Sequence, residues 1–515
     1  MVLRGRRKET ETGKRGITIG RRVGKIGFMG RGVSPPSREK ADVVHALGLR
    51  IDEDLIVERE SERERCRQDL MPVRGWLGRV FSRKPLAVLY PDSGQCVADI
   101  LDVCIEERTF AVPRGLGSVG LGGATSLRGG IVIDLSRMDK VVMVDRENLK
   151  VTVEAGCTWA RLREAVSAED LGLRSYPSGS VSGTIGGWLS SGGYGIGTLA
   201  GGRFDTILDS LEVAVPSGLL VTAGHGSGRY SIESFTGTEG QLGVITGLTF
   251  SLKNKPEHRA HYVLGPVILE TAEETLGNLA RMDNPPFGLR LLCGGIPGLK
   301  EDAQLPNGGT LLALLVEGNE GEVRSFDKRL DELSGRLSAE VRRGEGARRV
   351  FEGSFTDSSK SEGKTVVRSG EALVGIDQVA RLIRILQNET GRSITLDCHV
   401  VGPNLVLVMT CYMIDRRDLP PVVRDVPLTV RVSLAALRCG GRPYGLGIWN
   451  SPFSKSVLGG DRKMLQAIKN DTDRLSILNP GKFFSLTTGG GLPVWGWSYR
   501  IGLRMIGALG QGGVR

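Results

Sequence analysis

Two glycine-dense segments hold the residues whose types and spacing are best suited to chemistry. Seven glycines fall between Val112 and Leu135, and we call residues 115–130 the first glycine loop. Ten more fall in residues 177–202, the second glycine loop. Glycine permits positive φ and close approach, so several backbone N–H groups can converge on one anion. The two loops therefore predict a long ligand with a diphosphate, which lies between them and is held mostly by main-chain groups.

Residues 115–120 match the pattern G-x-G-x-x-G of dinucleotide-binding Rossmann folds. A predicted strand precedes them, and Asp134 follows at a spacing that suits a ribose-binding acid. In that fold the third glycine opens a helix, yet residues 121–130 contain four more glycines, each of which costs a helix about 1 kcal/mol. We therefore expect an irregular anion-binding loop, with Asp134 at a strand end and Arg114 either reinforcing the site or bracing the loop.

The chain is basic, but its charge is concentrated at the start. The formal net charge is +10, and residues 1–40 contain twelve Lys or Arg against three Glu, which leaves the remainder near neutral. We expect a disordered basic tail in residues 1–40, which could bind RNA or anionic lipid nonspecifically, and we expect nucleic acid to bind nowhere else. The eight cysteines lie far apart without iron–sulfur or zinc spacing, which favours buried thiols in a reducing compartment. No run of eighteen residues is apolar, so we expect a cytoplasmic protein.

The elements that must position the two loops are predicted from periodicity and turn signals. The predicted strands cover residues 85–91, 108–115, 130–156 and 211–224. The predicted helices cover residues 93–107 and 157–172, with Ser93 and Thr158 as N-caps. Residues 130–156 have the pattern of a meander that turns at 145–148, and residues 211–224 have that of a hairpin that turns at 216–218. Residues 176–207 are expected to be almost entirely loop.

The chain changes character near residue 256. From there to about residue 475 glycines are fewer, and segments of helix and strand length alternate, which predicts a second α+β domain after a first domain at 41–255. Near the C-terminus, residues 494–509 carry apolar side chains four positions apart beside arginines. This segment is either a helix that packs on the protein or a peripheral contact with the inner face of a membrane.

Seven motifs recur in the order found in a known family. They are "PRGLGSVGLGGA" (113–124), "VIDLSRM" (132–138), "VTVEAGCTWARL" (151–162), "SGTIGGWLSSGGYGIGT" (182–198), "LEVAVPSG" (211–218), "GTEGQLGVIT" (237–246) and "LNPGKFF" (478–484). With them the chain resembles the FAD-linked oxidases, the PCMH or vanillyl-alcohol-oxidase superfamily, and especially the D-lactate dehydrogenase and glycolate oxidase branch. The resemblance implies an α+β fold with a two-part PCMH-type FAD-binding domain, a substrate (cap) domain at 256–475, and a return of residues 476–515 to the FAD domain.

The same resemblance implies which residues contact FAD. In the first loop, which wraps the pyrophosphate, they are Arg114, Gly115, Gly117, Ser118, Val119 and Gly120. In the second loop, which passes the flavin ring, they are Pro177, Ser178, Gly183, Thr184, Gly187, Ser190, Gly192, Gly193 and Gly195. Elsewhere they are Gly243, Val244, Ile245, Asn479 and Lys482, with Lys482 near flavin N1 and O2. Some relatives tether flavin to a histidine near the first loop; residues 114–130 contain none, so we expect non-covalent FAD.

The substrate side departs from the family pattern. Relatives in this branch often hold a metal with two histidines and an asparagine; His399 and Asn404 match the first spacing, but no second histidine follows. We therefore expect no metal, and His399 is either a hydrogen-bonded core residue or the best histidine of the pocket. Tyr444 takes the position of the family's acid–base histidine and would act as a base only if cations lowered its pKa. Arg442 and Arg438 are candidates for that effect or for clamping a substrate carboxylate.

These features predict an FAD-linked dehydrogenase or oxidase. Its substrate would be a small 2-hydroxy acid, similar to D-lactate or glycolate, which gives a hydride to flavin N5. Without iron–sulfur spacing in the chain, electrons would leave to a quinone, an iron–sulfur subunit or oxygen. Two alternatives stay open: a non-redox flavoenzyme similar to alkyl-dihydroxyacetonephosphate synthase, and an RNA- or partner-binding protein with a vestigial flavin site.

Overall fold

A computed structural model of the chain describes residues 40–70, 75–178, 183–226, 230–294, 310–353, 364–390, 395–415, 421–495 and 499. The described residues belong to one compact unit. The predicted tail, except Lys40, and most of the segment 494–509 lie outside the described residues. Within the part that is described, no helix is both long and apolar enough to cross a bilayer.

A four-stranded sheet, in the order β1-β2-β4-β3, carries the first glycine loop. Its strands are β1 (Ile56–Val57), β2 (Ala87–Leu89), β3 (Ala111–Arg114) and β4 (Ile131–Asp134). Helix α4 (Gly94–Glu106) connects β2 to β3 and is capped by Ser93, which accepts a hydrogen bond from Cys96 N–H at 3.2 Å, as predicted. The loop leaves the sheet at Arg114 and returns to it at Ile131.

The predicted meander across residues 130–156 is wrong at its first strand. β4 pairs in parallel with both β2 and β3, because the chain re-enters the sheet beside the strand it left. Only β5 (Val141–Asp145) and β6 (Lys150–Glu154) form an antiparallel hairpin, whose turn is closed by Asn148 N–H donating to Asp145 at 3.0 Å. These two strands belong to a different sheet.

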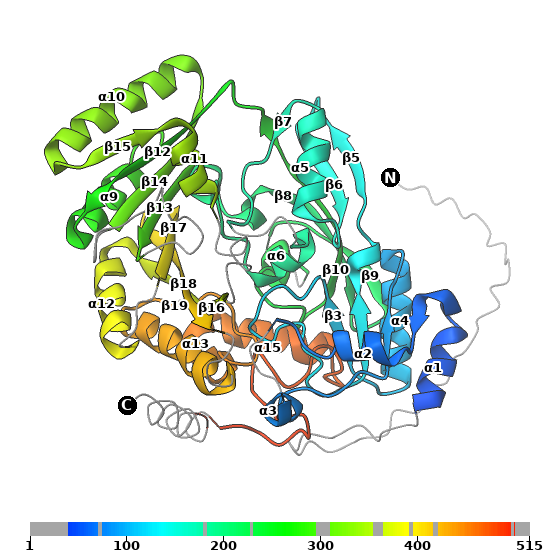
Figure 1. The fold of residues 1–515 in the computed structure, drawn as a ribbon. Helices are drawn as coiled ribbons and strands as arrows, with labels where there is room; N and C mark the ends of the chain where they lie inside the picture. Colours follow the sequence, from blue (N-terminus) through cyan, green and yellow to red (C-terminus); the bar gives the residue numbers. More distant parts are fainter. Residues whose placement is uncertain are drawn as a thin grey trace, which may run out of the picture. The chain divides into compact units, whose positions relative to one another are not determined.

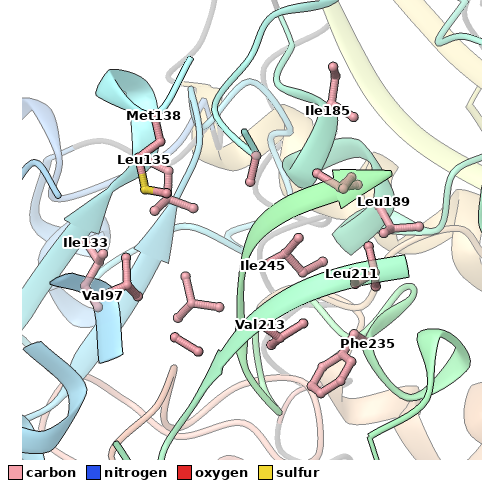
Figure 2. Close-up of a cluster of buried hydrophobic side chains, with 14 of the residues drawn as sticks. Val97, Ile133, Leu135, Met138, Ile185, Leu189, Leu211, Val213, Phe235 and Ile245 are labelled. Atoms are coloured by element: carbon pink, nitrogen blue, oxygen red, sulfur yellow. The ribbon is translucent and has the colours of Figure 1, made fainter. Parts of the chain in front are cut away.

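That second sheet has five antiparallel strands in the order β5-β6-β10-β8-β9. It contains β8 (Leu208–Val215), β9 (Leu219–Ala223) and β10 (Val244–Ser251), and the predicted hairpin joins β8 to β9. Figure 2 shows the hydrophobic core that the two sheets enclose. Its labelled members are Val97, Ile133, Leu135, Met138, Ile185, Leu189, Leu211, Val213, Phe235 and Ile245.

The second glycine loop is more helical than predicted. It contains α6 (Ile185–Ser191) and α7 (Thr198–Gly201), and a 3-10 turn follows at Phe204–Ile207. Helix α6 forms despite its glycines because Thr184 caps it, accepting a hydrogen bond from Gly187 N–H at 3.2 Å, and because Ile185 and Leu189 are fully buried. Burial of an apolar face outweighs the low helix propensity of glycine here.

Eight antiparallel strands form a third sheet, in the order β15-β12-β14-β13-β17-β18-β16-β19. The strands are β12 (His258–Val267), β13 (Gly288–Cys293), β14 (Thr310–Gly318), β15 (Glu340–Arg343), β16 (Lys364–Gly375), β17 (Thr395–Gly402), β18 (Leu405–Asp415) and β19 (Arg442–Pro443). One face packs on helices α9 (Leu269–Ala280), α10 (Glu320–Leu337), α12 (Val379–Thr390) and α13 (Pro421–Arg438) (Figure 1). We call the opposite face the inner face.

The inner face packs against the second glycine loop. Tyr194 of that loop clusters with Val401, Leu407 and Met409 of the sheet, and the hydroxyl of Ser178 contacts the Met409 sulfur at 3.8 Å. Helix α11 (Gly344–Glu352) covers the part of this face near β14. The sheet therefore forms a wall opposite the second loop.

The chain returns to the first sheet near its end. After α14 (Ser454–Leu458) and α15 (Asp461–Thr472), residues 477–479 run parallel to β3. Ala111 N–H donates to Ile477 O at 3.0 Å, and Asn479 N–H donates to Ala111 O at 2.7 Å. This return brings Lys482 under the first glycine loop.

Candidate active site

The first glycine loop is irregular, as predicted. No helix forms between residues 121 and 130, so the Rossmann arrangement is excluded. Gly117, Gly122, Gly129 and Gly130 have φ values of +63°, +88°, +78° and +86°, which other residues rarely adopt. Asp134 ends β4 and its carboxylate lies 3.3 Å from the Arg65 guanidinium, consistent with a strand-end role.

A run of N–H groups in this loop makes no hydrogen bond of good geometry to the described residues. From Leu116 to Ala124, no backbone N–H donates to an acceptor within the part of the chain that the structure describes. Leu116, Ser118 and Val119 are exposed. Nine successive N–H groups without a protein acceptor are unusual in a folded chain, because backbone donors are nearly always paired with protein, ligand or water. The loop therefore fits a diphosphate.

Lys482 fixes the orientation of two peptide units at the end of this run. Its ammonium is buried and donates to three carbonyl oxygens of the loop, Gly122 O at 3.1 Å, Gly123 O at 2.7 Å and Thr125 O at 2.6 Å. In a trans peptide the C=O and N–H point in opposite directions, so the Gly122 and Gly123 carbonyls turn the N–H groups of Gly123 and Ala124 away from Lys482. The N–H that follows Thr125 O belongs to Ser126 and donates to Arg67 O at 3.0 Å. All three donors of Lys482 are used by the loop, and its place beside flavin N1 and O2 stays a prediction.

A cluster of charges surrounds Lys482. Burial lowers the pKa of Lys482 to about 7, although Asp69 and Glu239 oppose that shift. Glu239 accepts hydrogen bonds from Leu446 N–H at 2.7 Å and Gly447 N–H at 2.8 Å, and burial raises its pKa to about 6. Arg114 is buried and donates to Gln68 O at 3.1 Å, and its guanidinium lies so close to Gly117 of the loop that a Cβ added there would be 2.5 Å from it.

Asn479 ties the return segment to the same place. Its amide nitrogen donates to Glu239 O at 2.7 Å and to Gly123 O at 3.2 Å, and its backbone has a φ of +50°. The backbone carbonyl of Asn479 accepts a hydrogen bond from Gln241 Nε2 at 2.8 Å. The predicted cofactor residues Asn479 and Lys482 therefore lie together beneath the first loop. The sequence did not single out Glu239 or Asp69, although Glu239 lies in the quoted motif at 237–246.

The structure brings the two glycine loops into contact. A Cβ added at Gly115 would lie 2.4 Å from the Thr184 hydroxyl of the second loop. The second loop also contacts the charged cluster around Lys482, because Glu239 N–H donates to Ser190 O at 2.9 Å. Gly183 O accepts from Trp159 N–H at 3.2 Å. A Cβ at Gly195 would lie 2.2 Å from Tyr176 O, so only glycine fits at this position.

The remaining cofactor candidates have separate places. Pro177, Gly187, Gly192 and Gly193 lie in the second loop with those just described. Val244 and Ile245 are buried in β10 and pair with Ala214 and Val213 of β8. Gly243 precedes them, and an added Cβ there would lie 2.5 Å from a Val213 methyl. Val244 and Ile245 thus belong to the five-stranded sheet, and Gly243 packs against it.

Tyr444 lies between the second loop and the inner face. Its hydroxyl accepts a hydrogen bond from Tyr194 N–H at 3.2 Å, and a Cβ added at Gly192 would lie 3.1 Å from its ring. Burial raises the pKa of Tyr444 far above its ordinary value, and the opposing effect of Arg442 is smaller. Tyr444 is therefore protonated at neutral pH, and the condition under which it would act as a base is not met. Arg438 is exposed at the end of α13.

His399 lies on the inner face and is 2% exposed. Its Nε2 is 3.1 Å from the carboxylate of Asp397, which the sequence did not single out. Among the described residues, no three His, Cys, Asp or Glu side chains gather as metal ligands would. His399 thus has a carboxylate partner on its own strand.

Comparison with known proteins shows which class of protein shares this fold. Residues 85–224 match a family model described as "FAD binding domain". The fold is shared with 4-ethylphenol oxidase from Gulosibacter chungangensis, with a TM-score of 0.71 and 17% identity over 89% of this chain and 98% of that one. It is shared with p-cresol methylhydroxylase, with a TM-score of 0.68 and 17% identity over 86% of this chain and 96% of that one. The chain is a flavoprotein with a PCMH-type FAD-binding fold, which confirms the expected α+β class.

The relatives by sequence are more specific. The chain is 24% identical to "Glycolate oxidase subunit GlcD" of Bacillus subtilis, over 79% of this chain and 90% of the relative. It is 29% identical to "D-lactate dehydrogenase" of Anaerostipes hadrus over 34% of this chain, a match that spans only 38% of that protein. The resemblance to the FAD-linked oxidases and to this branch is thereby confirmed.

Proposed function

We propose that the protein binds FAD non-covalently between its two glycine loops and oxidises a small 2-hydroxy acid similar to D-lactate or glycolate. The observation that carries the proposal is the run of nine backbone N–H groups, Leu116 to Ala124, without an acceptor in the described protein. The relatives named as glycolate oxidase and D-lactate dehydrogenase support the choice of substrate class. When bound, the flavin would take up a hydride from the substrate's α-carbon.

The described residues supply the parts that this chemistry requires. The first loop would hold the diphosphate through its N–H groups, with Lys482 and Arg114 keeping the loop in shape from below. The first loop contains no histidine, and this supports a dissociable cofactor. We propose that residues 41–255 and 476–515 form the FAD domain and that 256–475 form the substrate domain.

The substrate would lie between the second loop and the inner face. Tyr444 presents a protonated hydroxyl, which can donate a hydrogen bond to a substrate oxygen. Arg442 is close enough to act on the pKa of Tyr444, which makes it the better placed of the two arginine candidates to bind a carboxylate. Arg438 is exposed and is the weaker candidate.

Anaerobic reduction by substrate tests this function. The purified protein should be yellow, and D-lactate, glycolate and related 2-hydroxy acids should be added to it without oxygen. We expect at least one of them to bleach the visible flavin band. Reoxidation by a quinone, by an iron–sulfur partner or by oxygen then identifies the acceptor. If the flavin stays oxidised with every acid, the proposed oxidation is wrong.

One fold comparison favours a second candidate. An alkyldihydroxyacetonephosphate synthase matches with a TM-score of 0.69 and 17% identity over 87% of each chain. A non-redox exchange of this type would form product without bleaching the flavin band. The same anaerobic experiment therefore separates the two candidates. Binding of RNA by residues 1–40 is a third candidate function, which an RNA-binding measurement on these residues tests directly.

We expect the affinity for FAD to fall as the pH rises from 7 to 9. With a pKa of about 7, Lys482 is an ammonium below that pH and loses a proton above it, so one of its three carbonyl partners loses a donor. The anionic diphosphate favours the charged lysine, so binding takes up a proton and the Kd rises by up to about tenfold per pH unit. Calorimetric titration at several pH values measures this. A Kd that is constant from pH 7 to 9 would contradict it.

A further inference from the structure

Two arginines lie against one turn near the end of the described chain. We call residues 488–492 the C-terminal turn, which contains three successive glycines. A Cβ added at Gly490 would lie 3.7 Å from Arg83 Nη2. A Cβ added at Gly491 would lie 2.9 Å from Arg128 Nη2. The turn therefore brings two guanidinium groups together from segments that are far apart in the sequence.

Neither arginine is neutralised by an acidic side chain. Within the described part of the chain, the guanidinium groups of Arg83 and Arg128 make no hydrogen bond and no ion pair. Arg128 lies over the Phe110 ring, 5.0 Å from its centre, and burial together with the charge of Arg83 lowers the pKa of Arg128. Like charges held this close repel each other, so the pair favours an anion from outside the chain.

The segments that meet here carry no negative side chain in the sequence. Although 58 of the 515 residues are Asp or Glu, three long segments contain none and together hold twelve Lys or Arg; they are residues 70–91, 108–133 and 474–515. Two hydrogen bonds join them, from Arg83 N–H to Ser126 O at 2.7 Å and from Gly489 N–H to Val80 O at 2.8 Å. Figure 1 shows α3 (Gly75–Val80) beside the red C-terminal segment at the lower edge of the molecule. The surface at this junction is therefore positive.

Two large apolar side chains protrude beside the arginines. Leu492 of the C-terminal turn is 70% exposed, and Trp495 is 59% exposed. Val494, which precedes Trp495, packs in one apolar cluster with Leu127, which precedes Arg128. Trp495 and Arg128 therefore emerge from the same part of the surface, with Leu492 close by in the sequence.

An anionic bilayer suits this combination of side chains. Its lipid phosphates are acceptors for guanidinium groups, and the layer beneath them receives apolar side chains; the amphipathic ring of tryptophan is enriched at that depth. Leu492 and Trp495 protrude singly, and a fluid bilayer accommodates protruding side chains without a complementary pocket. Nucleic acid would take the arginines but offers no apolar layer for Leu492.

We propose that Arg83, Arg128 and the C-terminal turn bind the surface of a bilayer that contains anionic phospholipid. The two guanidinium groups contact lipid phosphates, and Leu492 and Trp495 enter the boundary between headgroups and acyl chains. Contact of this kind is peripheral, because the side chains reach only the outer layer of the bilayer. It does not depend on which substrate the protein oxidises.

Cosedimentation of the full-length protein with phosphatidylglycerol vesicles tests the arginines. We expect R83Q/R128Q to lower the partition coefficient by about 30-fold, because each cation near an anionic surface contributes about fivefold. The matched control is K328Q/R329Q, which removes two exposed cations of α10 and should change the coefficient by less than about threefold. R83Q alone, at an exposed position, should give about a fivefold loss and serves if R128Q destabilises the fold.

A second measurement reports on the apolar side chains alone, since the basic residues 1–40 attract anionic vesicles in every variant. Brominated phosphatidylglycerol quenches tryptophan that enters the bilayer. We expect the vesicles to quench part of the wild-type emission and W495F, which keeps an aromatic ring there, to lose most of that quenching. L492S/W495S should lower the partition coefficient by at least about tenfold, whereas L49S, at a side chain that is 73% exposed elsewhere, should leave it unchanged.

Three results would overturn the inference. Equal partition of R83Q/R128Q and K328Q/R329Q would show that residues 1–40 alone hold the vesicles. Quenching of W495F to the same extent as the wild type would show that Trp495 stays outside the bilayer, as it would if residues 500–515 or another protein covered it. Equal binding to neutral phosphatidylcholine vesicles would show that the arginines do not select an anionic surface.

Discussion

The K482M variant is expected to lose FAD. Methionine has a similar length but donates no hydrogen bond, so the hydrogen bonds from Lys482 to Gly122 O, Gly123 O and Thr125 O would be lost, and Gly123 O would keep the one from Asn479. At about 1 kcal/mol for each lost hydrogen bond, the Kd for FAD should rise by about 100-fold or more. The loss of a buried cation beside Glu239 should also lower the free energy of unfolding by about 3 kcal/mol. Calorimetric titration and denaturant unfolding measure the two effects.

The chain offers a matched control in Lys469 of α15. Its ammonium is also buried and donates to Gln241 O and Leu478 O, both at 2.7 Å, but to no carbonyl of the first glycine loop. K469M should therefore lose comparable stability while its Kd for FAD changes by less than about threefold. Equal affinities of K482M and K469M for FAD would show that Lys482 only stabilises the fold.

The G115A variant is expected to separate the two loops. The added Cβ would lie 2.4 Å from the Thr184 hydroxyl, which accepts the hydrogen bond that caps α6. Moving this hydroxyl costs about 1 kcal/mol for the lost cap, and displacement of the first loop adds to that cost. We expect the Kd for FAD to rise at least about tenfold. Absorbance of the flavin retained after gel filtration, followed by titration, measures this.

Gly335 of α10 supplies the comparison. A Cβ there would meet no heavy atom within 4 Å, and its φ is not in the left-handed range. G335A should therefore bind FAD within about twofold of the wild type. If G115A and G335A bind equally well, contact between the loops is not required for the cofactor.

Local sequence patterns were sufficient to predict much of the fold. The caps at Ser93 and Thr158, the hairpin at 216–218 and the irregular first loop follow from short patterns, and all are present. Helix α6 was missed because glycine propensity suggested a loop, whereas burial of Ile185 and Leu189 decided the outcome. The parallel pairing of β4 was missed because periodicity identifies a strand but not its partner.

The candidate site was likewise only partly predictable from local sequence. The glycine density indicated the diphosphate loop, and the family motif indicated Lys482, but only the fold shows that this lysine holds loop carbonyls. Asp397 stands two positions before His399 on one strand, a local signal that both side chains share a face. Arg290 precedes Asp397 by 107 residues, so only the strand order brings them together.

The return of the C-terminal segment has a consequence for biosynthesis. Lys482 follows Gly122 by 360 residues, yet it completes the loop that would receive the diphosphate. On the ribosome the loop is made long before its lysine, so a nascent chain cannot capture flavin until synthesis is almost complete. A product released before residue 482 would stay colourless and would be a target for proteolysis.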